Sequence, residues 1–229
     1  MSTQRTRATG ARGSKGTATA EFGRDRLLFA ALALFAEQGV EAVPMRLVNR
    51  AAGARNNSAL HYHFGGKQGL VEALVGFIQD WFETRRESAL RALETRPREQ
   101  PAAVREVLSA FLLPYRILLE SEPWGSDAIR FLGRMEFEAD PATREVLNLY
   151  AVPAMRRVRA LLLRALPQLP RRVLQQRLAH CLSSILLGLA DRRSLKHSYV
   201  GDAAPRNLDA LVDLYIDYHA AALAAPVVD

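Results

Sequence analysis

The apolar residues of this chain recur three and four positions apart from Arg24 almost to the C-terminus. This spacing places them on one face of an α-helix, whereas a strand would require alternation. Glycine and proline are expected to stand between such segments, where helices end. The pattern therefore predicts an all-α protein, with helices at 24–38, 44–52, 56–64, 67–95, 101–121, 125–138, 141–166, 170–192 and 206–225.

Hydropathy and cysteine content exclude several classes of protein. No apolar run approaches the roughly 18 residues that a membrane-spanning helix needs. The basic N-terminus is not followed by an apolar segment of the kind found in signal peptides. The single cysteine, Cys181, excludes an intrachain disulfide framework and a cysteine-cluster zinc site. We expect a cytoplasmic protein with no membrane partner.

The net charge of +7 is concentrated in the first third of the chain. Residues 1–67 contain ten basic and four acidic side chains, which leaves a net charge of only +1 for the remainder. Such an asymmetry indicates a polyanionic partner, because neutralising phosphates releases counterions. The alternative is that the excess arginines only decorate a solvated face.

Composition also suggests how the chain is divided. Residues 1–20 contain no large apolar side chain after Met1, and we interpret 1–22 as a disordered basic arm. Residues 23–67 hold three short helices and form the first predicted domain, which is the basic one. Residues 68–229 hold longer and more apolar helices and form the second, with the long helix 67–95 as a rigid junction.

The three short helices have the spacing of a helix-turn-helix module. Gly39 can provide the left-handed C-cap of the first helix, and Pro44 suits the first turn of the second. Gly53 allows a tight turn before the third helix. Leu60 and Phe64 lie one turn apart and should hold that third helix to the core. Its remaining faces would then be free to contact DNA.

These segments resemble the DNA-binding domain of the tetracycline-repressor (TetR) family of bacterial regulators. The resemblance rests on LALFAEQGV at 32–40 and AAGARNNSALHYHFGGK at 51–67. It implies an N-terminal helix-turn-helix domain followed by a larger helical domain for ligand binding and dimerisation. It also implies a repressor that leaves double-stranded operator DNA when a small effector binds.

Side chains on and around the third helix are the candidates for DNA contact, because they can reach base edges or phosphates. Arg55 can bind guanine or hold a phosphate, and Asn56 and Asn57 can either bind adenine or cap the helix. Arg46 is either a phosphate clamp or a solvated arginine. The full set of predicted DNA contacts is Arg46, Arg55, Asn56, Asn57, Ser58, His61, Tyr62 and Lys67.

Large apolar side chains in 68–229 can serve either as core or as the lining of a cavity. In TetR-like proteins this region encloses an effector, so the resemblance implies a cavity suited to an apolar or amphipathic molecule. The candidate lining residues are Trp81, Phe111, Tyr115, Trp124, Phe131 and Met135.

The last two helices carry more apolar surface than one core face needs. Such helices are commonly buried by a second molecule, which predicts a two-fold homodimer and a palindromic operator. The alternative is that the terminal helix covers only its own core. The predicted interface comprises Leu182, Ile185, Leu186, Leu189, Leu211, Tyr215 and Tyr218.

No constellation of residues predicts catalysis, a cofactor or a bound metal. His61 and His63 lie two positions apart and would point in opposite directions from a helix, so they cannot chelate one ion. GGKQG at 65–69 lacks the upstream glycine and the Ser/Thr of a phosphate loop. Two alternatives to a ligand-responsive regulator stay open: an architectural DNA-binding protein, and a helical enzyme acting on an apolar substrate.

Overall fold

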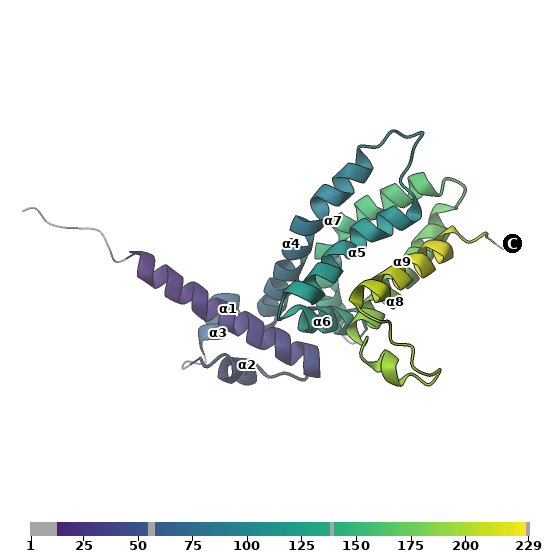
Figure 1. The fold of residues 1–229 in the computed structure, drawn as a ribbon. Coiled ribbons are helices and arrows are strands. Elements are labelled where there is room, and N and C mark those ends of the chain that lie inside the picture. The colour runs from purple at the N-terminus through teal and green to yellow at the C-terminus, as the bar shows by residue number, and fades with distance from the viewer. Residues whose placement is uncertain (1–12, 55–57, 138–139, 228–229) are drawn as a thin grey trace, which may run out of the picture.

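The computed structural model describes residues 13–54, 58–137 and 140–227, which fold into helices joined by short loops (Figure 1). Within these ranges there is no strand, only an isolated antiparallel bridge between Ser198 and Gly201. The α-helices are α1 (Gly13–Gln38), α2 (Met45–Ala51), α3 (Ser58–Phe64), α4 (Lys67–Glu94), α5 (Val104–Ser121), α6 (Gly125–Phe137), α7 (Pro141–Ala165), α8 (Arg171–Ala190) and α9 (Leu208–Ala224), with a 3-10 turn, η1 (Ser194–His197), before the last. The predicted all-α fold is confirmed. None of the described helices is long and apolar enough to cross a membrane.

Two details differ from the sequence prediction. Helix α1 begins at Gly13 instead of near Arg24, so the predicted disordered arm is helical from Gly13 onward, and residues 1–12 lie outside the described part. Extending an existing helix adds one hydrogen bond per residue and needs no new nucleus. Prolines were also expected between helices, yet Pro114 lies inside α5 and Pro153 inside α7, as the predicted ranges 101–121 and 141–166 already required. Both helices pack on α4, and this packing offsets the hydrogen bond that each proline removes.

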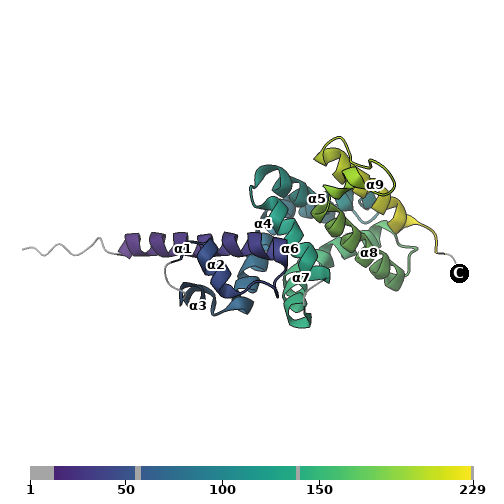
Figure 2. The ribbon, with the colours of Figure 1, turned by 90° about the horizontal axis from the view of Figure 1, so that it is seen from below.

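The helices form two groups at opposite ends of the molecule. Seen from below, α1, α2 and α3 lie at one end, and α8 and α9 lie at the other (Figure 2). Helix α4 contacts α1 and α3 at its beginning and packs against α5 and α7 along its length. Helix α6 packs against both α1 and α8. One continuous buried cluster runs from Leu27 in α1 to Leu223 in α9.

Helix α6 is attached directly to the end of α1. Arg134 donates hydrogen bonds to the carbonyl oxygens of Ala36 (2.9 Å) and Glu37 (2.8 Å) in the last turn of α1. These carbonyls have no partner within the helix, so a guanidinium satisfies them and complements the helix dipole. Phe35 and Phe131 stack nearby with ring centroids 6.2 Å apart. The two ends of the molecule are therefore joined by packing as well as by the chain.

His219 of α9 is a buried titratable residue that should make the stability of the fold depend on pH. Its side chain is buried, and its Nε2 atom has no hydrogen-bond partner among the described residues. Burial lowers the pKa of His219 from its ordinary value of 6.5, because the charged imidazolium is poorly solvated there. The unfolded chain therefore binds the proton more readily, and stability is lost as the pH falls below about 6.5 towards the lower pKa of folded His219.

We expect the thermal unfolding midpoint to drop between pH 7.5 and pH 5.5, and to drop less in the His219→Gln variant. Other groups titrate in both proteins, so the difference between the two pH profiles isolates His219. Parallel profiles would show that His219 does not contribute to the pH dependence.

Candidate DNA interface and effector cavity

The turn between α2 and α3 is built around Gly53. This residue has a φ of 64°, in the left-handed region that favours glycine. A Cβ atom at this position would lie 2.4 Å from the Nη2 atom of Arg26. The amide of Ala54 donates to the carbonyl oxygen of Asn49 (2.9 Å) and closes the end of α2. The turn thus needs glycine for its backbone conformation, and a Cβ atom there would also displace the flexible end of the Arg26 side chain.

Helix α3 has one face in the core and one in solvent. Leu60 is buried and Phe64 is half-buried, as their spacing predicted. On the outer side, Tyr62 is 83% exposed and His61 is also exposed. The predicted outward-facing short helix is therefore present. Its aromatic hydroxyl and imidazole can reach the groove of a duplex placed against it.

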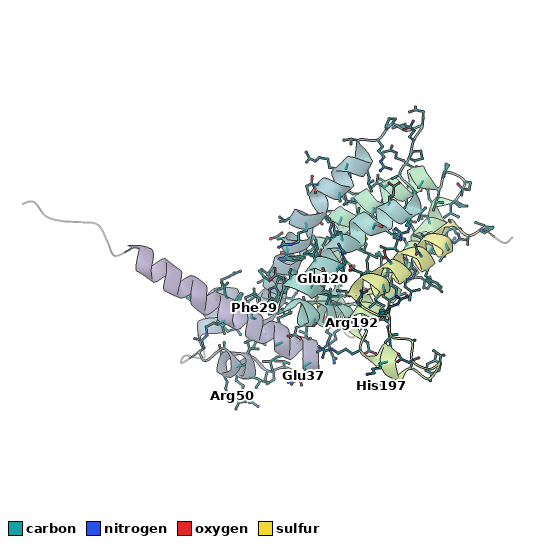
Figure 3. The ribbon with its side chains drawn as sticks, viewed as in Figure 1. Phe29, Glu37, Arg50, Glu120, Arg192 and His197 are labelled. Atoms are coloured by element: carbon teal, nitrogen blue, oxygen red, sulfur yellow. The ribbon has the colours of Figure 1, made fainter. Side chains whose placement is uncertain are left out.

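Positive charge next to α3 comes from α2. Arg46 and Arg50 are both exposed and lie four residues apart, so they share one side of this helix. Arg50 lies on the outer side of α2, away from the C-terminal helices (Figure 3). Arg46 is among the predicted DNA contacts and Arg50 is not, although its position four residues after Arg46 places both on one side of a helix. Two arginines one turn apart can clamp neighbouring phosphates.

Lys67 has a partner inside the protein. Its ammonium group donates a hydrogen bond to the carbonyl oxygen of Glu41 (3.1 Å) and lies 3.8 Å from the carboxylate of the same residue. It therefore ties the loop after α1 to the start of α4. A phosphate contact by Lys67 stays a prediction and would have to compete with these interactions.

The remaining predicted contacts can be placed only in part. Ser58 is the first residue of α3. Arg55, Asn56 and Asn57 lie outside the described residues, so their contacts with bases or with the helix end stay predictions.

A cavity of about 240 Å³ lies within the C-terminal group of helices. Two of the six predicted lining residues, Phe111 and Tyr115, border it. Five helices, α4 to α8, contribute to its wall. The lining comprises Gln79, Arg86, Phe111, Tyr115, Leu132, Glu136, Leu147, Asn148, Ala151, Met155, Ala179, Leu182, Ser183, Ile185 and Leu186.

The other four predicted pocket residues lie elsewhere. Trp81 and Trp124 contact each other at 6.0 Å between ring centroids, and Trp124 also contacts Phe77 and Phe29. This aromatic group belongs to the place where α1 meets α4, at the labelled Phe29 (Figure 3). Phe131 and Met135 are fully buried in the core instead. The sequence could not separate these cases, because all four occupy core-like positions on their own helices.

Comparison with known families agrees with this geometry at both ends of the molecule. Residues 27–74 match the family model described as bacterial regulatory proteins of the tetR family. Residues 109–222 match the one described as the tetracyclin repressor-like C-terminal domain. The chain belongs to the TetR family. It is thus a helix-turn-helix transcriptional regulator that binds DNA through its N-terminal domain, as the sequence predicted.

Several individual TetR-type proteins are similar to this chain. The transcriptional repressor KstR2 of Rhodococcus jostii is 40% identical over 74 residues, which span 32% of this chain and 36% of that protein. The transcriptional regulator BetI of Rhizobium meliloti is 29% identical over 197 residues, covering 85% and 86% of the two chains.

Solved TetR structures share the fold. A regulator from Marinobacter aquaeolei superposes with a TM-score of 0.58 at 16% identity, covering 90% of this chain and 97% of that one. PfmR from Thermus thermophilus gives a TM-score of 0.55 at 18% identity, covering 90% and 98%.

Membership of the TetR family also bears on the alternatives left open by the sequence. The family is non-enzymatic, which confirms the expectation that the chain is not an enzyme. The C-terminal domain of a TetR protein binds a ligand, which implies an effector. Within the residues that can be described, no three His, Cys, Asp or Glu side chains are grouped to hold a metal ion.

The predicted TetR dimer residues divide into three groups. Ile185, Leu189 and Leu211 are buried within the single chain. Leu182, Leu186 and again Ile185 line the cavity, and Tyr215 packs closely over Gly188. Only Tyr218 is largely exposed, at 66%. Most of the predicted stripe is therefore the inner face of α8 and α9, and the sequence did not show which side of each helix faces the core.

Proposed function

We propose that two copies of this chain form a homodimer that binds a palindromic operator as a repressor and leaves it when a small effector fills the cavity. In a dimer the two α3 helices would enter successive major grooves, with half-sites about 34 Å apart. In this proposal the effector changes the separation of the two α3 helices. The domain boundary at 67 is part of the proposal, whereas the predicted boundary at 22 falls inside α1.

The observation that carries this proposal is that two helices each contact both functional regions. Helix α4 begins beside α3 and contributes Gln79 and Arg86 to the cavity. At 1.5 Å per residue, Lys67 and Arg86 are about 28 Å apart along one helix. Helix α6 lines the cavity through Leu132 and Glu136, while Arg134 between them holds the end of α1. A ligand that shifts either helix therefore also moves the DNA-binding end.

The outer surface of α8 and α9 supports the dimer. Leu187 is 45% exposed and Leu214 is 56% exposed, and both lie on these adjacent helices with Tyr218. The acidic side of α9 is already used within the chain, because Asp209 pairs with Arg116 and Asp217 with Arg105. The exposed apolar side chains thus remain for a second copy. This end of the molecule lies opposite α2 and α3, which leaves the DNA-binding surface free (Figure 2).

Selection of bound DNA from a random pool tests the operator. We expect an inverted repeat to be enriched and to bind about 10³-fold more tightly than random duplex at physiological salt. Retention of every duplex with equal affinity would contradict sequence-specific binding and favour the architectural alternative. Enrichment of a single half-site without symmetry would contradict the dimer.

A further inference from the structure

A buried charged side chain borders the cavity. Arg86 of α4 is only 1% exposed and borders the cavity together with Phe111 and Tyr115. Arginine keeps its charge in proteins, and burying a charge is strongly unfavourable unless an anion or several acceptors compensate it. This position therefore needs a negatively charged partner.

The hydrogen-bond donors of Arg86 are only partly used. Its Nε and Nη2 atoms are buried and have no hydrogen-bond partner in the described part of the chain. These two N–H groups lie along one edge of the guanidinium, and this edge can bind both oxygens of a carboxylate at once. The unfilled donors thus have the geometry of a carboxylate site.

Glu83 neutralises Arg86 without filling this edge. Its Oε1 atom is 3.5 Å from Nε, close enough for an ion pair, but it forms no hydrogen bond and is itself buried without a partner. The nearby rings of Phe82 and Phe111, each 5.2 Å from the guanidinium carbon, fix the group from its sides. Arg86 is therefore held in place with two buried donors that have no hydrogen-bond partner among the described residues.

The rest of the cavity suits an apolar group. Leu132, Met155 and Ile185 are among its lining residues, and burial raises the pKa of Tyr115, whose hydroxyl therefore remains a proton donor. The acidic residue of the lining, Glu136, is half-buried and thus less deep than Arg86. A volume of about 240 Å³ is slightly below the range of roughly 300–1,000 Å³ for drug-sized ligands. The ligand should be small.

We propose that the effector is a small amphipathic carboxylic acid whose carboxylate binds the Nε–Nη2 edge of Arg86 while its apolar part fills the remaining cavity. This inference rests on the proposed function, since it names the chemical class of the effector for the same cavity. The exposed lining residues Asn148 and Ala179 mark the side from which such a molecule would enter.

Calorimetry with the full chain tests this assignment. The probes are butanoate, hexanoate, octanoate and phenylacetate, each compared with the alcohol of the same skeleton. We expect at least one acid to bind more tightly than its alcohol. Arg86→Met should weaken that acid by about 10- to 100-fold, the range for hydrogen bonds to a charged group. Arg86→Lys keeps the charge but lacks the two-donor edge, so it should not restore the affinity.

Glu83→Gln separates ligand binding from a purely structural ion pair. This variant removes the carboxylate that competes for Arg86, so it should raise the affinity for the acid, whereas Arg86→Met should lower it. If the ion pair were purely structural, both variants would change the acid affinity in the same direction. Arg85→Met is the matched control, because Arg85 stacks on Trp81 outside the cavity and should leave acid binding unchanged. Circular dichroism verifies that each variant is folded.

Two results would overturn the assignment: no acid binding better than its alcohol, or Arg86→Met binding the acid like wild type. Operator binding without ligand is measured on the same wild-type protein. If the operator is bound but acids show no preference, the effector class is wrong and the proposed regulator stands. If no operator is bound, the regulator proposal fails, and the acid titration still reports on Arg86.

Discussion

Replacing two exposed leucines, Leu187→Glu with Leu214→Glu, should convert the protein into a monomer and remove most of its operator affinity. Both side chains are exposed in the single chain, so the substitutions should not disturb its core. Two-fold pairing would place four new carboxylates at one interface. A monomer contacts only one half-site, and the loss of the linked second contact reduces affinity by about 10²- to 10⁴-fold.

Light scattering and operator titration measure this effect together. Leu149→Glu is the matched control, because Leu149 is 71% exposed on α7 and lies outside the proposed interface. This control should remain dimeric and bind the operator normally. A wild-type protein that has the mass of one chain, or a doubly substituted protein that still dimerises, would show that α8 and α9 do not form the interface.

Replacing both exposed arginines of α2, Arg46→Ala with Arg50→Ala, should weaken operator binding by about 100-fold if each contacts one phosphate. The loss should be similar for specific and random DNA, because phosphates carry no sequence information. Because the bound dimer carries two copies of each arginine, four phosphate contacts are lost, and the slope of log affinity against log salt should fall by about 3.6, roughly 0.9 per phosphate. Titration at several salt concentrations measures both quantities.

The matched control for the two arginines is Arg156→Ala with Arg159→Ala. These residues are exposed on α7 and their removal changes the net charge equally. If the control weakened binding as much as the α2 variant, total charge alone would explain the effect. An unchanged salt slope in the α2 variant would show that Arg46 and Arg50 do not contact phosphates.

The DNA-binding end was largely predictable because its signals are local. The left-handed conformation of Gly39 and Gly53 follows from the turns in which they lie. The core positions of Leu28, Leu32 and Leu60 follow from helical spacing. The same spacing places Arg50 beside Arg46 on α2. The predicted start of α1 near residue 24 was wrong, because residues 13–22 carry no periodic apolar pattern that would mark a helix.

The lining of the cavity and the proposed dimer surface were much less predictable. Trp81 and Phe111 both occupy core-like positions on helices, yet only Phe111 borders the cavity. Leu189 and Leu187 lie two positions apart on α8, yet Leu189 is buried and Leu187 is exposed. Arg86 was not a candidate at all, because arginines are usually at the surface.

The amino-acid sequence by itself determined the helices, the helix-turn-helix and the TetR family, because periodicity and turn residues act within a few positions of one another. Only the tertiary structure decided that Arg86 is buried, which apolar side chains enclose a cavity, and which ones are left at the surface. Each of these properties depends on the neighbouring helix that covers a residue. That neighbour comes from a distant part of the chain, and spacing along one helix carries no information about it.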